Sequence, residues 1–200
     1  MNSEADNVIG LYERHATNWD DDRGNHLFEK PWLDQFTALL KLGSSVLDIG
    51  CGSAGPITRF LAEQGYKITG VDSSQSMINI CKCRLPRQEW VVADMRELCL
   101  EARFNGIIAW DSFFHLSPEH QRRMFPLFRK HSSSKAVLLF TSGPAAGEAI
   151  GEYRGEPLYH GSLAAAEYRE LLECNGFAVI SHVERDASCG DHTVWLAQLR

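Results

Sequence analysis

The chain has 200 residues, of which 44% are hydrophobic and 23% are charged, and its formal net charge at pH 7 is −6. This composition is typical of a globular protein, and no apolar run approaches the roughly 20 residues that are needed to cross a bilayer. Because no cluster of basic residues could hold a polyanion, we expect neither a nucleic acid nor a membrane as partner.

Residues 1–44 are predicted to form an N-terminal helical cap. Apolar residues such as Val8, Leu11 and Phe36 recur there at helical spacing. From residue 45 the hydrophobic pattern changes, and short apolar runs alternate with helix-like segments. This pattern predicts a core over 45–200 with parallel strands and crossover helices. We expect one domain over 1–200.

A glycine-rich turn follows the first predicted strand, in "VLDIGCGSAG" (46–55). Its spacing, Gly50-x-Gly52-x-x-Gly55, lets a ligand approach backbone amides at the start of a helix. Dinucleotide enzymes use such a turn for a pyrophosphate, but Asp48 would repel that anion. A ligand with an ammonium or sulfonium group would instead gain from the carboxylate.

Acids also end the next two predicted strands. Asp72 lies 17 residues after Gly55, near the spacing of a carboxylate that holds two ribose hydroxyls, and Asp94 ends the third strand. The three acids are therefore expected to point into one crevice. Asp94 could equally be the N-cap of the segment that follows it, which is a common use of Asp.

The fourth strand is followed by "WDSFFHLS" (110–117), which offers Asp111 and His115. They are four residues apart, so one helical turn would bring them to the same side. His115 is the first choice for a general base or for orienting a substrate, since an imidazole titrates near neutral pH. It could also simply hydrogen-bond a loop or line the cofactor pocket.

Residues 142–162 form an insertion between the fifth strand and the last helix. They include five glycines, and we expect a lid-like loop without regular structure. His160 lies near its end, where the chain rejoins the sheet, and is predicted to be a pocket residue.

The last two apolar runs, 177–186 and 192–199, are separated by too few residues for a crossover helix and must pair antiparallel. The whole pattern predicts an α/β fold. It is a doubly wound, mostly parallel seven-stranded sheet, Rossmann-like, with an antiparallel terminal strand and helices on both faces.

These motifs resemble those of the class I S-adenosylmethionine-dependent methyltransferases, from about residue 45 to the C-terminus. "VLDIGCGSAG" is similar to the first motif of that family, "GVDSS" (70–74) to its ribose-binding acid, "VVADM" (91–95) to its adenine segment and "GIIAWDSFFHL" (106–116) to its fourth-strand motif. The resemblance implies S-adenosyl-L-methionine as cofactor, S-adenosyl-L-homocysteine as product and a small-molecule acceptor. The cofactor-binding residues that it implies, with Asp48 added from its charge, are Tyr12, Trp19, Asp48, Gly50, Cys51, Gly52, Asp72, Ser73, Met77, Asp94, Met95 and Trp110.

Three other functions stay open beside this one. The chain could be a cofactor-binding partner of an active subunit, or a methyltransferase acting on protein or nucleic acid. An NAD-dependent oxidoreductase comes last, because Asp48 and the terminal antiparallel strand disfavour it. The accepting atom and the oligomeric state are left undecided by the sequence.

Metal and disulfide chemistry are not expected. The six cysteines have no spacing typical of a zinc site or a disulfide framework, which suggests reduced thiols in a cytoplasmic protein. His115, His160 and His192, with Asp111 or Asp191, lack the close spacing of a local metal motif.

Overall fold

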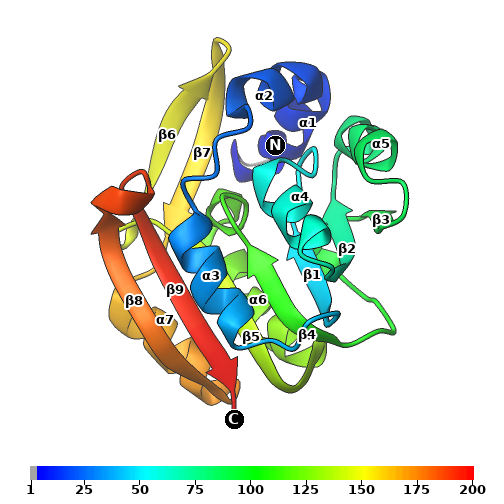
Figure 1. The fold of residues 1–200 in the computed structure, drawn as a ribbon. Helices are drawn as coiled ribbons and strands as arrows, with labels where there is room; N and C mark the ends of the chain where they lie inside the picture. The colour runs from blue at the N-terminus through cyan, green and yellow to red at the C-terminus, as the bar shows by residue number, and fades with distance from the viewer. Residues whose placement is uncertain (1–3) are drawn as a thin grey trace.

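The computed structural model describes residues 4–200, and its centre is a seven-stranded sheet in the order β3-β2-β1-β4-β5-β9-β8 (Figure 1). Strands β1 to β5 of this sheet are parallel, and β9 runs antiparallel to both β5 and β8. The predicted doubly wound sheet with an antiparallel terminal strand is thereby confirmed. The strands of this sheet are β1 (Ser45–Ile49), β2 (Lys67–Asp72), β3 (Glu89–Val92), β4 (Phe104–Ala109), β5 (Ser132–Ser142), β8 (Phe177–Asp186) and β9 (His192–Leu199).

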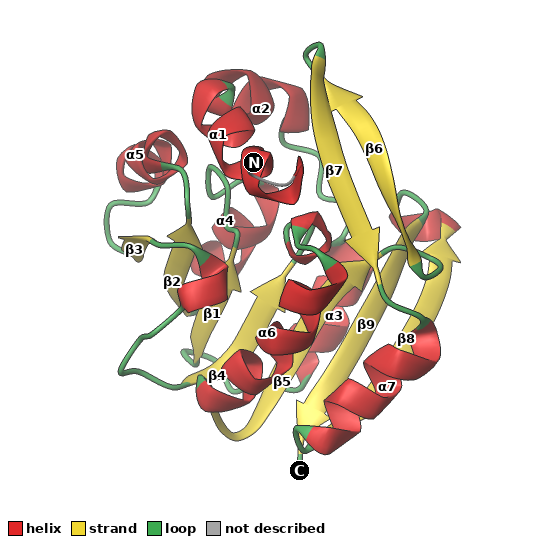
Figure 2. Cartoon of the chain, turned by 180° about the vertical axis from the view of Figure 1, so that it is seen from behind, coloured by secondary structure: helices red, strands yellow, loops and turns green. Residues whose placement is uncertain are grey.

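Helices cover both faces and one end of the sheet (Figures 1 and 2). The α-helices are α1 (Glu4–Arg14), α2 (Ala16–Arg23), α3 (Lys30–Ala38), α4 (Pro56–Glu63), α5 (Gln75–Arg84), α6 (Pro118–Lys130) and α7 (Ala165–Cys174). Three short 3-10 helices are η1 (Met95–Glu97), η2 (Phe113–His115) and η3 (Ala187–Cys189). Within the described residues, none of these helices is long and apolar enough to span a membrane.

Two apolar cores follow from the alternation of side chains along the buried strands. In β5, Leu138 packs into the core under α6 and α7, whereas Val137 and Leu139 pack into the core under α3 and α4. Successive side chains of a strand point to opposite faces, so a strand covered on both faces must be apolar throughout. This explains the uninterrupted apolar run of β5.

The first two helices lie at the carboxyl end of the parallel strands (Figure 1). Val8 and Leu11 of α1 pack against Leu158 and Tyr159, which belong to a second, two-stranded sheet. That contact places α1 and α2 as a roof above the strand ends.

The insertion at 142–162 differs from the prediction. Instead of an irregular loop it forms a β-hairpin of β6 (Gly147–Tyr153) and β7 (Glu156–Ser162), which stands beside α1 and α2 (Figure 2). Arg154 and Gly155 form the turn with φ of 53° and 81°. Two residues with positive φ match the twist of a two-residue hairpin, and this turn fixes the pairing.

Candidate functional site

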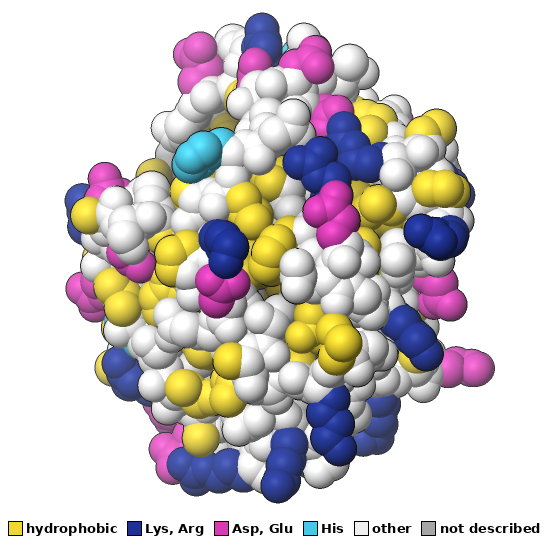
Figure 3. Space-filling view, in the orientation of Figure 1, with side chains coloured by type: hydrophobic (Ala, Val, Ile, Leu, Met, Phe, Trp, Pro, Cys, Tyr) yellow, Lys and Arg dark blue, Asp and Glu magenta, His cyan; other side chains and the backbone are white. Residues whose placement is uncertain are grey.

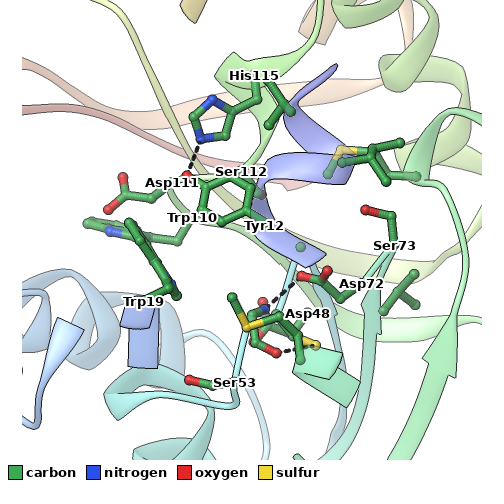
Figure 4. Close-up of a pocket in the computed structure, with 18 of the residues that line it drawn as sticks. Tyr12, Trp19, Asp48, Ser53, Asp72, Ser73, Trp110, Asp111, Ser112 and His115 are labelled. Carbon is green, nitrogen blue, oxygen red and sulfur yellow. Dashed lines mark hydrogen bonds between the residues drawn. The ribbon is translucent and has the colours of Figure 1, made fainter. Parts of the chain in front are cut away.

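The crevice lies where the order of the sheet reverses. The chain leaves β1 toward β2 on one side, while β4 is the neighbour of β1 on the other side, and ligands bind at the carboxyl ends of strands at such a point. Here the strand ends and the α1–α2 roof enclose a hollow of about 1110 Å³, its open mouth included (Figure 4). All the predicted cofactor residues line it, and so do Asp111 and His115.

The glycine turn has a shape that requires glycine at Gly50. This residue has φ of 71°, and an added Cβ would lie 2.2 Å from the Cβ of Ser112. The backbone N–H groups of Gly50 and Cys51 both donate to the carbonyl oxygen of Val71, at 2.7 and 3.0 Å. The turn is therefore fixed against β2, and its backbone is exposed to the hollow.

Asp48 is a buried acid on β1, and Asp72 is a half-buried acid at the end of the neighbouring strand β2. Asp48 accepts a hydrogen bond from the Thr58 hydroxyl, and burial, with a smaller effect of the Asp72 charge, raises its pKa to about 6. Asp72 accepts from the backbone N–H groups of Gly52 and Ser74, each at 2.9 Å. Burial raises the pKa of Asp72 as well, while these two N–H donors favour its ionised form.

Ser73 and Met77 lie at the start of α5, beside the second acid. Met77 is buried, and its N–H donates to Ser74, the N-cap of the helix. Glu13 of α1 accepts from the hydroxyls of Ser74 and Ser76, at 2.6 and 2.7 Å. These bonds tie the roof to the strand end that carries Asp72.

Asp94 has the structural role that the sequence left open. It caps η1 by accepting from the Arg96 N–H at 2.9 Å, and it forms an ion pair with the Arg96 guanidinium at 2.6 Å. It still lines the hollow, next to Met95, which packs partly buried against the main core. Contact with an adenine therefore stays a prediction for both residues.

Trp110 and Asp111 form the wall at the end of β4. The Trp110 ring packs against His192 with centroids 5.7 Å apart, and its buried Nε1 has no hydrogen-bond partner among the described residues. The Nε2 of His192 lies 2.9 Å from a carboxylate oxygen of Asp111. The Nδ1 of the same ring lies 2.7 Å from the carbonyl oxygen of Cys189. Burial opposes the charge on His192, but its bond to Asp111 and the Asp111 charge outweigh that effect and raise its pKa.

His115 is held in one tautomer. Its Nδ1 lies 2.8 Å from the carbonyl oxygen of Tyr159, which can only accept, so Nδ1 carries the hydrogen. Its Nε2 is then an acceptor for the Tyr12 hydroxyl at 2.9 Å (Figure 4). Burial lowers the pKa of His115 to about 4, so the ring is neutral at physiological pH.

The remaining predicted residues take different places. Trp19 of α2 lines the hollow, and its ring meets that of Tyr12 edge-on, with centroids 5.2 Å apart. His160 does not line the hollow, contrary to the prediction of a pocket residue. Its ring packs against those of His115 and Phe114, with centroids 5.0 and 5.3 Å apart, because β7 directs the side chain toward these two rings and not into the hollow.

Sequence reasoning missed several lining residues. Arg23 at the end of α2 faces the turn and forms an ion pair with the buried Glu29. Thr58 carries the hydroxyl that bonds Asp48, and Ser112 donates to the Ile49 carbonyl at 2.7 Å. No sequence signal pairs these residues with the strand ends, since each contact forms only on folding.

The structure also bears on metal and thiol chemistry. Among residues 4–200, no group of three or more His, Cys, Asp or Glu side chains could hold a metal ion. All six cysteines are free thiols, three of them buried.

Comparisons with known proteins give a consistent result. Residues 46–133 match a family model described as a methyltransferase domain. Magnesium-protoporphyrin O-methyltransferase of Rhodobacter capsulatus is 32% identical over 51% of this chain and 46% of its own length. Trans-aconitate 2-methyltransferase of Azoarcus sp. (strain BH72) is 30% identical over 64% of this chain and 55% of its own length. The chain thus spans about half the length of these curated relatives.

A solved structure extends the likeness to the entire fold. Magnesium protoporphyrin IX methyltransferase from Synechocystis PCC 6803, crystallised with S-adenosylmethionine bound, superposes with a TM-score of 0.75. The match covers 100% of this chain and 99% of that chain at 16% identity, a level that shows the shared fold.

Proposed function

We propose that this chain, which belongs to the class I S-adenosylmethionine-dependent methyltransferase family, binds S-adenosylmethionine and transfers its methyl group to a small-molecule acceptor. The observation that carries the proposal is the convergence of the glycine turn with Asp48, Asp72 and Asp94 on one hollow. Acids beside a ligand-binding turn favour a sulfonium and an ammonium group over a pyrophosphate.

The residues present fit such a cofactor. Asp72 is a half-buried acceptor suited to two ribose hydroxyls, and the turn backbone at Gly50 and Gly52 is open to the methionine portion. Arg23 adds a guanidinium near the turn for a carboxylate.

The chemistry asks little of the protein beyond alignment. A bound sulfonium supplies a methyl group that is already activated for in-line displacement. The chain must position the nucleophile, exclude water and, where the nucleophile loses a proton, receive that proton. We assign the last task to His115. Its neutral Nε2 is reached through the Tyr12 hydroxyl, so Tyr12 stands between the acceptor and the base.

A small acceptor is supported by the surroundings of the hollow. The α1–α2 roof and the β6–β7 hairpin stand over the strand ends, which leaves little room for a macromolecule. On the face in Figure 3, basic side chains lie along the edge farthest from α1 and α2 and also nearer to these helices, where acidic side chains accompany them. The two curated relatives named above carry names of small-molecule methyltransferases.

The direct test is calorimetric titration of the purified protein with S-adenosylhomocysteine, with NAD as the control. We expect micromolar binding of S-adenosylhomocysteine and none of NAD. Absence of S-adenosylhomocysteine binding would overturn the proposal, and binding of NAD in its place would favour the oxidoreductase. After binding is established, a screen of small acceptors for homocysteine-forming turnover would separate an enzyme from a cofactor-binding partner subunit.

A further inference from the structure

Two acids of the hollow, the buried Asp48 and the half-buried Asp72, differ in what holds them. Asp48 and Asp72 are on adjacent parallel strands, and Asp48 pairs in register with Gly70, two residues before Asp72. Their side chains are close enough for the charge of Asp72 to oppose ionisation of Asp48. When two nearby acids cannot both ionise at low cost, the one with the weaker hydrogen-bond donors keeps a proton.

The donors identify that acid as Asp48. Asp72 has two backbone N–H groups, from Gly52 and Ser74, which can only donate and therefore favour a carboxylate. Asp48 has the Thr58 hydroxyl, which can donate to a carboxylate or accept from a carboxylic acid. Asp48 can therefore change its protonation state without losing its hydrogen bond, and only 5% of its surface is exposed.

The two forms of the proposed cofactor share an ammonium and a carboxylate group and differ by one charge, at sulfur. S-adenosylmethionine carries a sulfonium cation, whereas S-adenosylhomocysteine carries a neutral thioether. We propose that Asp48 is the proton-linked acid that distinguishes them: binding of the sulfonium form favours its carboxylate, whereas binding of the neutral thioether does not. This inference rests on the proposed function and assigns Asp48 a role in selecting the charged cofactor over its product.

The same role accounts for the charge balance of a turnover. Transfer of the methyl group to a hydroxyl or amine breaks the sulfur–carbon bond, forms the new bond and releases one proton from the acceptor. The sulfonium loses its charge in that step. The proton of the acceptor goes to His115, as assigned above, and the Asp48 carboxylate that attracted the sulfonium gains nothing from the neutral product, so the product is held less tightly than the substrate form.

Other titratable and polar groups lie near Asp48, and they decide which control variants the experiment needs. Asp72 faces it from β2, Thr58 from α4 and Cys51 from the turn, and Arg23 of α2 lines the same hollow. Behind Trp110 and Asp111, His192 is a second titratable group: burial lowers its pKa, but its bond to Asp111 and the Asp111 charge outweigh that effect and raise it. A variant at His192 must therefore accompany any variant at Asp48.

The experiment compares the two ligands on the same protein. The dissociation constants of S-adenosylmethionine and S-adenosylhomocysteine are measured by calorimetry from pH 5.0 to 7.5. For an acid with a pKa of about 6, we expect the affinity for S-adenosylmethionine to fall about tenfold at pH 5 and that for S-adenosylhomocysteine to stay constant. Titrations at pH 6 in two buffers of different ionisation enthalpy should detect proton release with S-adenosylmethionine alone.

Variants assign the linkage to Asp48. D48N should abolish the difference in pH dependence between the affinities for the two ligands. H192N and the exposed D34N should retain that difference. T58V, which removes the donor of the ionised form, should move the difference to higher pH, and this variant decides the matter if D48N does not fold. Equal pH dependence for both ligands, or a difference that persists in D48N, would overturn the inference. Failure to bind either ligand at any pH would instead overturn the proposed function.

Discussion

At the scale of single residues, Asp72 is the most sharply defined part of the candidate site. Replacing it by Ala should remove two hydrogen bonds to a charged acceptor, each worth about 1.5–3 kcal/mol. We expect D72A to weaken S-adenosylhomocysteine binding at least a hundredfold in calorimetry, with D21A on the exposed face of α2 as the control. D72N should lose less than D72A, because its amide oxygen can still accept from the Gly52 N–H. Unchanged affinity in a folded D72A variant would make the ribose assignment wrong.

His115 should act on turnover rather than on cofactor binding. H115A is expected to lower turnover by about a hundredfold or more, the usual contribution of a general base, and Y12F should show a smaller loss of the same kind. Because the pKa of His115 is lowered to about 4, its neutral form is present throughout the range above pH 5. Turnover should therefore show no acid limb from this residue between pH 5 and 8. An equal loss of S-adenosylhomocysteine affinity would place His115 in the cofactor wall instead.

At the scale of elements, the root of the hairpin is held by one buried amide. Gln121 of α6 donates to the carbonyls of Leu116 and Gly161, both at 2.8 Å, and accepts from the Tyr168 hydroxyl at 2.6 Å. This residue joins α6, α7, the base of β7 and the segment after His115. Gln121 thereby positions the Tyr159 carbonyl against the imidazole of His115.

Q121L should therefore destabilise the fold. It would remove the two hydrogen bonds that Gln121 donates to buried carbonyls and the one that it accepts from the Tyr168 hydroxyl, which keeps Ser162 and Leu163 as partners. We expect a loss of about 2–4 kcal/mol in the free energy of unfolding. Urea denaturation measures this, with Q35L on the exposed face of α3 as the matched control. A loss below about 0.5 kcal/mol would mean that water or other groups replace these bonds.

The elements also show which parts of the fold the sequence pattern predicts and which it does not. The strands of the central sheet are predictable because they are buried on both faces and read as apolar runs. The hairpin was not predictable in the same way. β6 is exposed over almost its whole length, so it has no alternating apolar pattern, and its glycines favour an irregular loop.

At the scale of the whole molecule, the meeting of the strand-end acids was predictable and the contacts of His115 and Asp111 were not. Asp48 and Asp72 lie at the carboxyl ends of parallel strands, which must meet at one edge, so their convergence follows from the topology. The partners of His115 and Asp111 do not. Tyr12 lies 103 residues from His115, and His192 lies 81 residues from Asp111. Only the folded chain reveals that the first helix and the last strand supply these contacts.

The attachment of α2 has a consequence for the kinetics of ligand access. Ala16 is the one buried residue that α2 contributes, and the helix is fastened instead by Asp20 to Arg84 at 2.7 Å and by Asp22 to Arg154 at 2.8 Å. Partly exposed ion pairs of this kind contribute little stability and weaken as salt screens them. Since α2 carries Trp19 over the hollow, ionic strength should change how quickly molecules enter and leave more than how tightly they are held.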